Sequence, residues 1–491
     1  FHFIMMKPEI LKITQISPDQ SVVCIIGKAE IPEMLKLTKT EKEYALGQLK
    51  ADEEYVFINS YFKCTYIVKV KDEKSHFRTR EELRKTASGL KKLIKSNNHS
   101  ELVITSYKAY KEAVEDFTEG LILGMYVFDK YKTKTDKADE KKSYPSKLLL
   151  LDGITKAEVK WLTDLTDAVY FTRDLINEPV NVLNAGALAS EVEKIGRKGG
   201  FKVDVLRKGK IEALKMGGLL AVNKGSVDPP VFCILEWNPA NKLNKKPIVL
   251  VGKGIVYDTG GLNIKTDNYM ALMKGDMAGA AAVTGVFYTA AKNKIPLHIM
   301  GFLPVTDNRP GGNAYTQGDI LTMHNGMTVE IGNTDAEGRL ILADAISYAS
   351  RYKPELIINI ATLTGSAAST FSNQAIAMMT NADRKYISLL EECGHNVHER
   401  VAELPFWDDY AEMIKSEFAD VRNIGGREAG AITAGKFLEK FTAFPLIHLD
   451  IAGTGLLKKD DHYRLKDGPA SGLRLLAAFL KKYAENYNKL N

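Results

Sequence analysis

The stretch NTDAEGRLILADA, from Asn333 to Ala345, places three charged residues directly ahead of an apolar run. Asp335, Glu337 and Arg339 occupy alternate positions, and in an extended segment their side chains would all point to one side. The apolar positions that follow have the spacing of a helix packed on a core: Leu340, Ile341, Leu342, Ala343, Ala345 and Ile346. The sequence therefore predicts two carboxylates and a guanidinium where a loop or strand gives way to a helix, a common place for chemistry in α/β proteins.

Length and composition indicate a globular protein with more than one domain. A chain of 491 residues exceeds a single ordinary core, and the usual size of domains suggests two or three. Its 67 basic and 61 acidic residues leave a net charge of +6, which is weak evidence for a polyanionic partner. No run approaches the roughly 18 consecutive apolar residues of a membrane span, so we expect no membrane partner.

The cysteines favour a reducing compartment. Cys24, Cys64, Cys233 and Cys393 are scattered without the CxxC spacing of a zinc ribbon or the pattern of a disulfide framework. The first residues also lack the basic region and apolar core of a signal peptide. We therefore expect a cytoplasmic protein.

Residues 1–155 are predicted to form a small α/β domain. A helix is predicted over residues 110–131, with Val127 on its apolar side. The β-rich runs of this part end at Gly27, Val70 and Tyr107. It contains no pair of acids, histidine cluster or glycine-rich phosphate loop, so we expect it to serve assembly or gating.

Residues 156–491 are predicted to form a larger α/β domain. After a long helix over residues 155–176, apolar strands alternate with helices, one of which carries Leu214 and Met216. The apolar runs are VFCILEW (231–237), PIVLVGKGIVYD (247–258), PLHIMGFLPV (296–305), ELIINIATL (355–363) and LIHLDIAG (446–453). Continuous apolar strands that alternate with helices are typical of a mainly parallel central sheet covered by helices.

The acids and lysines follow these strands. Because ligands bind beyond the carboxyl ends of parallel strands, separate loops can converge there. The candidates are Lys253, Asp258, Lys265, Asp276, Asp335 and Glu337, and glycines surround them. Carboxylates held so close would repel one another unless cations neutralised them. Two divalent ions about 3.5 to 4 Å apart would remove this repulsion and create a hydrolytic centre.

Several motifs resemble those of the leucyl aminopeptidase family, the di-zinc cytosol aminopeptidases of the M17 type. They are VGKGIVYDTGGLNIK (251–265), MKGDMAGAAAV (273–283), NTDAEGRL (333–340), ATLTG (361–365), NIGGREAGAITA (423–434) and HLDIAGT (448–454). The resemblance covers roughly the last two thirds of the chain, from about Asn177. It implies a metal-dependent enzyme that hydrolyses the N-terminal peptide bond of peptides.

The resemblance also implies a role for each charged residue. Asp258 and Glu337 would bridge two metal ions, Asp335 would complete one site, and Lys253 and Asp276 the other. Either Zn²⁺ or Mn²⁺ suits these donors. A water or hydroxide between the ions would attack the peptide carbonyl, while one ion binds the free α-amine.

Two further residues would be catalytic. Lys265 would face the scissile carbonyl and the negative charge that develops on it. Arg339 would hold a bicarbonate ion as general base, since a planar guanidinium matches a planar oxyanion. The backbone around Leu363 would help to seat that ion.

The resemblance places a pocket for the first substrate side chain beside Met273 and residues 362–365, which include Thr362 and Gly365, with Ala452 at its wall. Each of these positions is also compatible with plain core. The family's preference for leucine or other apolar residues is the expectation. Gly455 departs from it, because some relatives carry methionine there, and Thr316 and Gln317 replace a common Arg-Pro pair.

Other interpretations remain open. Asp276 could be a helix N-cap; His395 and His398 are interpreted as surface residues; and His448 and Asp450 as structural residues of a buried strand. A di-metal site could also hydrolyse phosphoesters. The alternative of another class is a DNA-binding hexamer with incidental peptidase activity, although no basic stripe interleaved with aromatic residues supports nucleic-acid binding. A homohexamer with active sites facing an enclosed space is implied by the resemblance alone.

Overall fold

The computed structural model describes residues 7–51, 53–133 and 143–490, except for the side chains of residues 267–269. The chain forms two compact units. The first extends to Tyr170 and includes Asp460–Leu465, and the second comprises Phe171–Lys459 and Lys466–Asn491. The change of unit falls within helix α4 (Lys156–Asn177). The predicted domain boundary between residues 155 and 156 stays a prediction.

The first unit is built on a six-stranded sheet with the order β1-β6-β5-β2-β4-β3. All neighbours are parallel except β3 and β4. Helices α2 and α3 pack on one face and α1 on the other. The elements are β1 (Glu9–Lys12), β2 (Val22–Ile26), η1 (Glu33–Leu35), α1 (Lys39–Lys50), β3 (Tyr55–Asn59), β4 (Cys64–Lys69), α2 (His76–Ser96), β5 (Glu101–Tyr107), α3 (Ala113–Met125) and β6 (Lys147–Leu150).

The helix predicted over residues 110–131 is shorter than the periodicity indicated. Helix α3 ends at Met125, and Tyr126 leaves the helical conformation with φ −58° and ψ 139°. Val127 is 43% exposed, so the pattern counted an exposed valine as part of the core face. The three predicted strands that end near Gly27, Val70 and Tyr107 are confirmed as β2, β4 and β5.

The second unit contains a nine-stranded sheet with the order β16-β15-β18-β14-β9-β11-β8-β7, and β10 pairs with β11. The central strands β18, β14, β9, β11 and β10 are parallel, whereas the pairs β7–β8, β8–β11 and β15–β18 are antiparallel. The strands are β7 (Lys202–Leu206), β8 (Val231–Trp237), β9 (Ile248–Gly252), β10 (Gly254–Asp258), β11 (Ile299–Asn308), β14 (Leu356–Ala361), β15 (Ile376–Thr380), β16 (Val401–Glu403) and β18 (Leu446–Asp450). The predicted α/β fold with a mainly parallel central sheet is confirmed.

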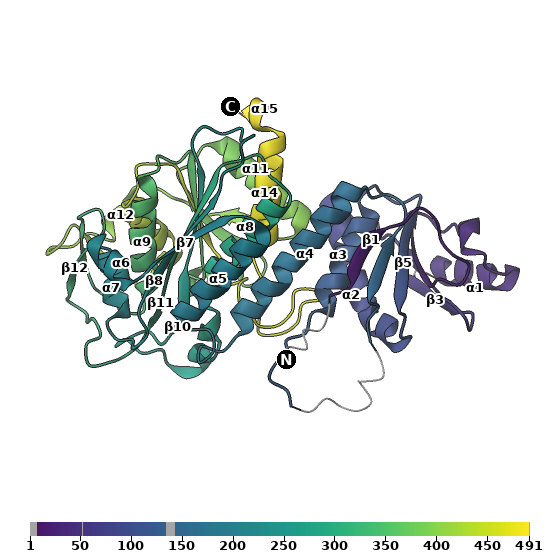
Figure 1. Ribbon diagram of the computed structural model, residues 1–491, viewed down its shortest axis with the longest axis horizontal. Coiled ribbons are helices and arrows are strands. Elements are labelled where there is room, and N and C mark those ends of the chain that lie inside the picture. The colour runs from purple at the N-terminus through teal and green to yellow at the C-terminus, as the bar shows by residue number, and fades with distance from the viewer. Residues whose placement is uncertain (1–6, 52, 134–142, 491) are drawn as a thin grey trace. The chain divides into compact units, whose positions relative to one another are not determined.

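Helices cover both faces of this sheet (Figure 1). On one face, Val249 and Val251 of β9 point toward the layer of α7, α9 and α13. On the other face α8 lies so close that a side chain at Gly252 would meet its backbone. The helices of this unit are α5 (Ala185–Gly199), α6 (Lys208–Ala213), α7 (Gly217–Asn223), η2 (Asp267–Gly275), α8 (Ala278–Lys292), α9 (Glu337–Ser350), α10 (Gly365–Phe371), α11 (Arg384–Val397), α12 (Asp409–Glu412), α13 (Gly430–Glu439), α14 (Leu473–Glu485) and α15 (Tyr487–Leu490).

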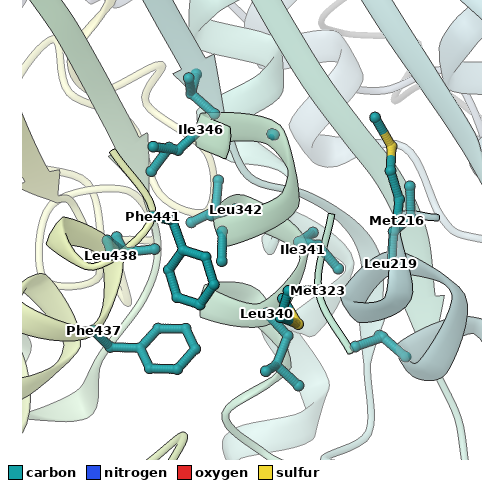
Figure 2. Close-up of a cluster of buried hydrophobic side chains, with 14 of the residues drawn as sticks. Met216, Leu219, Met323, Leu340, Ile341, Leu342, Ile346, Phe437, Leu438 and Phe441 are labelled. Carbon is teal, nitrogen blue, oxygen red and sulfur yellow. The ribbon is translucent and has the colours of Figure 1, made fainter. Parts of the chain in front are cut away.

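Helix α9 is fixed by packing on nearly every side. Its apolar side chains contact Met216 and Leu219 around α7 and Phe437 and Phe441 around α13 (Figure 2). The residues Leu340, Ile341, Leu342 and Ile346 of the helix are all fully buried. The packed helix predicted after Gly338 is thus confirmed, and it gives its first residue, Glu337, a rigid support.

Two local predictions were wrong. The helix predicted around Leu214 and Met216 is broken into α6 and α7, because Lys215 adopts a left-handed conformation with φ 55° between them. The strand before Asp335 is also not part of the central sheet. It is β13 (Thr328–Glu330), which lies in a separate small sheet with β12 (Ile320–Thr322) and β17 (Val421–Arg422).

Within the described residues, no helix has the length and apolarity that crossing a membrane requires.

Candidate metal centre and active site

Six charged side chains from separate segments of the second unit meet in one cluster. Lys253 lies between β9 and β10, Asp258 ends β10, and Lys265 lies in the loop that follows. Asp276 comes directly after η2, Asp335 lies in the turn before α9, and Glu337 is the first residue of that helix. The structure thus brings together all six residues that the sequence nominated around the metal centre.

Each of the two lysines joins a pair of acids. Lys253 Nζ lies 2.7 Å from Asp276 Oδ2 and 2.9 Å from Glu337 Oε1, and it donates a hydrogen bond of 3.1 Å to the carbonyl of Thr362. Lys265 Nζ lies 2.8 Å from Asp258 Oδ2 and 2.5 Å from Asp335 Oδ1. The lysine ammonium groups therefore compensate part of the negative charge that burial would make costly.

Burial and mutual repulsion perturb the acids strongly. Burial is the main cause that raises the pKa of Asp276 to about 8, against the attraction of Lys253, and Asp258 and Glu337 raise it further. Burial, followed by Glu337 and Asp258, raises the pKa of Asp335 to about 7. Burial also raises the pKa of Glu337. Such clustered, shifted carboxyl groups are typical of functional sites.

The surroundings of the two lysines favour their charged form, whereas those of the acids favour the neutral form. Burial disfavours the charge on Lys253, yet the carboxylates of Asp276, Glu337 and Asp258 raise its pKa. The pKa of Lys265 is likewise raised by Asp258, Glu337 and Asp335 despite its burial. Without another cation, the cluster depends on both ammonium charges.

The cluster fits divalent metal ions. Asp258, Asp335 and Glu337 each offer a carboxylate oxygen, and these oxygens lie within 4.8 Å of one another. Among the described residues, no hydrogen-bond donor reaches the buried Glu337 Oε2. Convergent carboxylate oxygens with an unused acceptor are the donors that hard or borderline divalent cations take.

A glycine at the start of α9 makes room for Lys253. A Cβ atom at Gly338 would lie 2.5 Å from Lys253 Cε, 2.8 Å from its Nζ and 2.9 Å from Leu363 Cδ1. Because contacts below 3.0 Å do not persist, any side chain at this position would displace Lys253 from its carboxylate partners. The first turn of the helix is therefore a surface on which the lysine lies.

Arg339 is a buried cation next to this cluster. It is 7% exposed, and its Nη1 donates a hydrogen bond of 2.8 Å to the carbonyl of Asn423. Within the described part of the chain its Nε finds no acceptor. Burial lowers its pKa to about 10, although Glu337 and Asp450 favour the charge. A buried guanidinium with an unused donor is suited to an anion.

The loop after β14 is tied to the end of β18 by Asp450. The Asp450 carboxylate accepts hydrogen bonds from the Leu363 amide at 3.1 Å, the Thr364 hydroxyl at 2.6 Å and the Ala452 amide at 3.0 Å. The predicted structural role of Asp450 is thus confirmed. Thr362 reaches the charged cluster itself, because its hydroxyl donates a hydrogen bond of 2.7 Å to Asp276 Oδ1.

The other two predicted pocket residues are only partly tied to the charged cluster. Met273 is half-buried in η2, close in sequence to Asp276, and Gly365 is the exposed first residue of α10. The Met273 carbonyl accepts a hydrogen bond of 3.3 Å from the Asp276 amide, whereas no described contact joins Gly365 to the acids.

Three histidines that the sequence singled out lie outside the charged cluster. His448 is fully buried, and its Nδ1 lies 2.6 Å from Asn359 Oδ1, which confirms a hydrogen-bonded core histidine. Burial lowers its pKa to about 3, and Arg339 contributes. His395 is exposed in the last turn of α11, whereas His398 is half-buried at the C-cap in a left-handed conformation.

Two details of the predicted geometry were wrong. Asp335, Glu337 and Arg339 do not lie on one side of an extended segment, because α9 already begins at Glu337, and helical residues two apart point about 200° away from each other. Asp276 is not an N-cap of α8, since the cap residue is Met277 and the Asp276 carboxylate instead contacts Lys253 and Thr362.

Sequence reasoning missed the polar residues behind the acids. Asn308, Tyr315 and Thr334 are buried and lie within hydrogen-bond distance of the acidic loops. A signal for Asn308 was available, because it ends the polar run Thr306–Asn308 that closes strand β11 at the same edge of the sheet as Asp258.

Comparisons with known proteins identify the family of the chain. The profile described as "Cytosol aminopeptidase family, catalytic domain" matches residues 170–477. A protein of Chlorobium phaeobacteroides named "Probable cytosol aminopeptidase" is 43% identical over 395 residues, which cover 77% of each chain. A protein of the same name from Chlorobaculum tepidum is 44% identical over 387 residues, which cover 76% of each chain.

A solved structure has a similar fold. It is the "Bottromycin maturation enzyme BotP in complex with Mn", with a TM-score of 0.83 and 25% sequence identity. The match covers 95% of this chain and the whole of that one.

The fold and the site define an α/β protein with a buried cluster of acids and lysines that suits divalent metal ions. The sequence matches are more specific than that class. The chain belongs to the cytosol aminopeptidase family, the M17 peptidases. This membership supports metallo-aminopeptidase activity, that is, hydrolysis of peptides.

Proposed function

We propose that this protein releases N-terminal residues from peptides with the help of two divalent metal ions per chain. The observation that carries the proposal is the cluster in which Lys253 and Lys265 join four acids from three segments of the chain. The ligands would be Lys253, Asp258, Asp276, Asp335 and Glu337. We propose Zn²⁺ or Mn²⁺, because the donors suit both and the similar structure of BotP is a complex with Mn.

Bound metal ions would supply an activated water and polarise the peptide carbonyl. Lys265 is placed to complement them. Its Nζ lies between Asp258 and Asp335, and its side chain is 15% exposed, more open than that of Lys253. An ammonium at this position could donate a hydrogen bond to a carbonyl oxygen as negative charge develops on it.

We propose that Arg339 holds bicarbonate as the general base. The buried guanidinium, with Nε unused among the described residues, offers a planar donor set to a planar oxyanion. The backbone around Leu363 would help to seat the same ion. Since the Leu363 amide already donates to Asp450, its part would be to hold the loop in place.

The first substrate side chain would be surrounded by Met273, Thr362, Gly365 and Ala452. They are apolar or small, and Met273 and Ala452 are half-buried, which favours leucine or another apolar first residue.

The test is hydrolysis of a panel of aminoacyl amides after chelation and after return of each metal. Restored release of an N-terminal residue by Zn²⁺ or Mn²⁺ is expected, with leucine or another apolar residue fastest. A phosphoester substrate belongs in the same panel. The aminopeptidase proposal fails if no metal restores peptide hydrolysis, and phosphoester hydrolysis alone would assign the site to a different bond.

We further propose a cytoplasmic homohexamer in which residues 1–155 serve assembly or gating; the support is the family resemblance. No observation favours DNA binding, and the relatives reported above are named probable cytosol aminopeptidases.

A further inference from the structure

Asn308 is placed behind the charged cluster, where it contacts two of the acidic loops at once. It ends β11 and is fully buried. Its Nδ2 donates one hydrogen bond of 2.9 Å to Asp258 Oδ1 and another of 3.1 Å to the carbonyl of Thr334, the residue before Asp335. One amide group thus joins the loop after β10 to the turn before α9.

The chemistry of the partners fixes the orientation of this amide. A carboxylate oxygen and a backbone carbonyl only accept hydrogen bonds, so both amide hydrogens of Asn308 must face them. Its Oδ1 is buried and, within the described residues, has no donor. Both donors of this buried amide are used, whereas its acceptor is not. The reason for an asparagine at this position is therefore the two hydrogen bonds that it donates.

The backbone of Asn308 strengthens the same link. Its carbonyl accepts hydrogen bonds from the Thr259 amide at 3.0 Å and the Thr259 hydroxyl at 2.9 Å, directly after Asp258. Gly261, with φ +65°, lies so close that a Cβ atom there would be 2.9 Å from Asn308 Oδ1. The loop that carries Asp258 is therefore fixed against Asn308 at several points.

Thr334 is held equally firmly on the other side. Its carbonyl also accepts a hydrogen bond of 2.7 Å from the Tyr315 hydroxyl, and its own hydroxyl donates 2.7 Å to the Gly260 carbonyl. Asn308 is the residue of this group whose side chain donates to a carboxylate of the cluster, Asp258 Oδ1, and the Gly260 amide donates a hydrogen bond of 2.8 Å to the same oxygen.

We propose that Asn308 is a positioning residue that sets the separation of Asp258 and Asp335, and thereby the affinity of the site for divalent metal. This inference rests on the proposed metal-dependent function. Partners that orient a metal ligand typically contribute 10- to 100-fold to metal affinity. Asn308 would act through Asp258 and Thr334, without touching the ions or the substrate.

The experiment is calorimetric titration of the metal-free full chain with Mn²⁺ for the wild type, Asn308→Leu and Asn308→Ser. Leucine has a similar volume and removes both donors, whereas serine keeps one hydroxyl donor and is easier to accommodate. We expect Asn308→Leu to weaken Mn²⁺ binding by about 10- to 100-fold, and Asn308→Ser to weaken it less.

Asn244 provides a matched control. It is also buried in the second unit, and its Nδ2 donates to two backbone carbonyls, those of Lys246 and His298, with no acid of the cluster among its partners. Asn244→Leu should lower the melting temperature and leave Mn²⁺ affinity within about twofold of the wild type.

The outcomes separate the inference from the proposed function. If the wild type binds Mn²⁺ and both Asn308 variants bind it equally well, the positioning role is wrong and the proposed function stands. Equal losses in Asn244→Leu and Asn308→Leu would assign both residues to general stability and overturn the inference, as would failure of both Asn308 variants to fold while Asn244→Leu folds. A wild type that binds no divalent metal overturns both proposals.

Discussion

Lys253 and Lys265 have similar partners but different surroundings. The Lys253 side chain is 3% exposed and is enclosed by Asp276, Glu337 and the Thr362 carbonyl, whereas the Lys265 side chain is 15% exposed. The enclosed lysine is suited to a fixed place among the ligands. The more open one is suited to meet a substrate.

Replacement of Lys265 by alanine tests this difference. We expect Lys265→Ala to lower kcat by about 10²- to 10³-fold, the usual loss when a donor to a developing oxyanion is removed. Metal content, measured by elemental analysis, should stay near that of the wild type. Lys440→Ala, at an exposed lysine, is the control and should retain wild-type kcat. Loss of metal from Lys265→Ala would show that this lysine is a ligand.

Asp344, a residue outside the cluster, should make the free energy of unfolding depend on pH. It is fully buried, accepts hydrogen bonds of 2.9 Å from the Leu219 and His324 amides, and has a pKa that burial raises from 3.8 to about 7. Between these values the folded protein holds a proton that the unfolded chain has lost. The free energy of unfolding should therefore fall as pH rises from about 4 to about 7.

Asp344→Asn should remove this component of the pH dependence. The measurement is urea unfolding of both proteins at intervals from pH 4.5 to 8, with the difference between their unfolding free energies plotted against pH. Because the other titrating groups are common to both proteins, their contributions cancel in this difference. A difference that stays constant over the whole range would contradict the assignment.

At the scale of elements, α9 joins the core to the site. Its side chains pack between α7 and α13, while its first residue is one of the acids (Figure 2). We expect Leu342→Ala, at a fully buried position, to destabilise the protein by about 2–5 kcal/mol through the cavity that it leaves. Urea unfolding measures this change. Arg351→Ala, at the exposed C-cap of the helix, should stay within about 0.5 kcal/mol of the wild type, and an equally small effect of Leu342→Ala would contradict the packing.

The elements also show what the sequence could and could not predict. Long apolar runs such as PIVLV and LIINIA are fully buried central strands, and their pattern was sufficient to predict them. The break at Lys215 and the end of α3 at Met125 depend on backbone conformations that periodicity does not contain. Membership of β13 in a separate small sheet depends on pairing with β17, about ninety residues later in the chain.

The residues of the site also differ in how far the sequence could predict them. Lys253 and Asp258 were predictable because they follow strands of the central sheet, whereas Asp276 after η2 and Asp335 after β13 of the small sheet were predicted from their sequence motifs. The contacts of Asn308, Tyr315 and Thr334 were not predictable, even though the position of Asn308 at a strand end was visible, because only the folded chain shows which acid or carbonyl each one meets. The family resemblance supplied the proposed metal and bicarbonate roles, which remain to be tested.

At the scale of the whole molecule, the proposed homohexamer has a direct test. Light scattering after size-exclusion chromatography should give about six times the chain mass of 54.5 kDa. The hexamer proposal is wrong if the mass corresponds to a single chain at all concentrations tested. A salt-dependent gel shift that Asp335→Ala retains would revive DNA binding as a function separate from hydrolysis.

Gly338 has a consequence for how this protein could evolve. Alanine is favoured over glycine in a helix by up to about 1 kcal/mol, so Gly338→Ala should tend to strengthen α9. The same methyl group would lie 2.5 Å from Lys253 Cε and push the lysine off the helix. Selection for a more stable helix would therefore favour alanine at position 338, whereas selection for catalysis would keep glycine. In a lineage that lost its peptidase activity, the glycine could be exchanged.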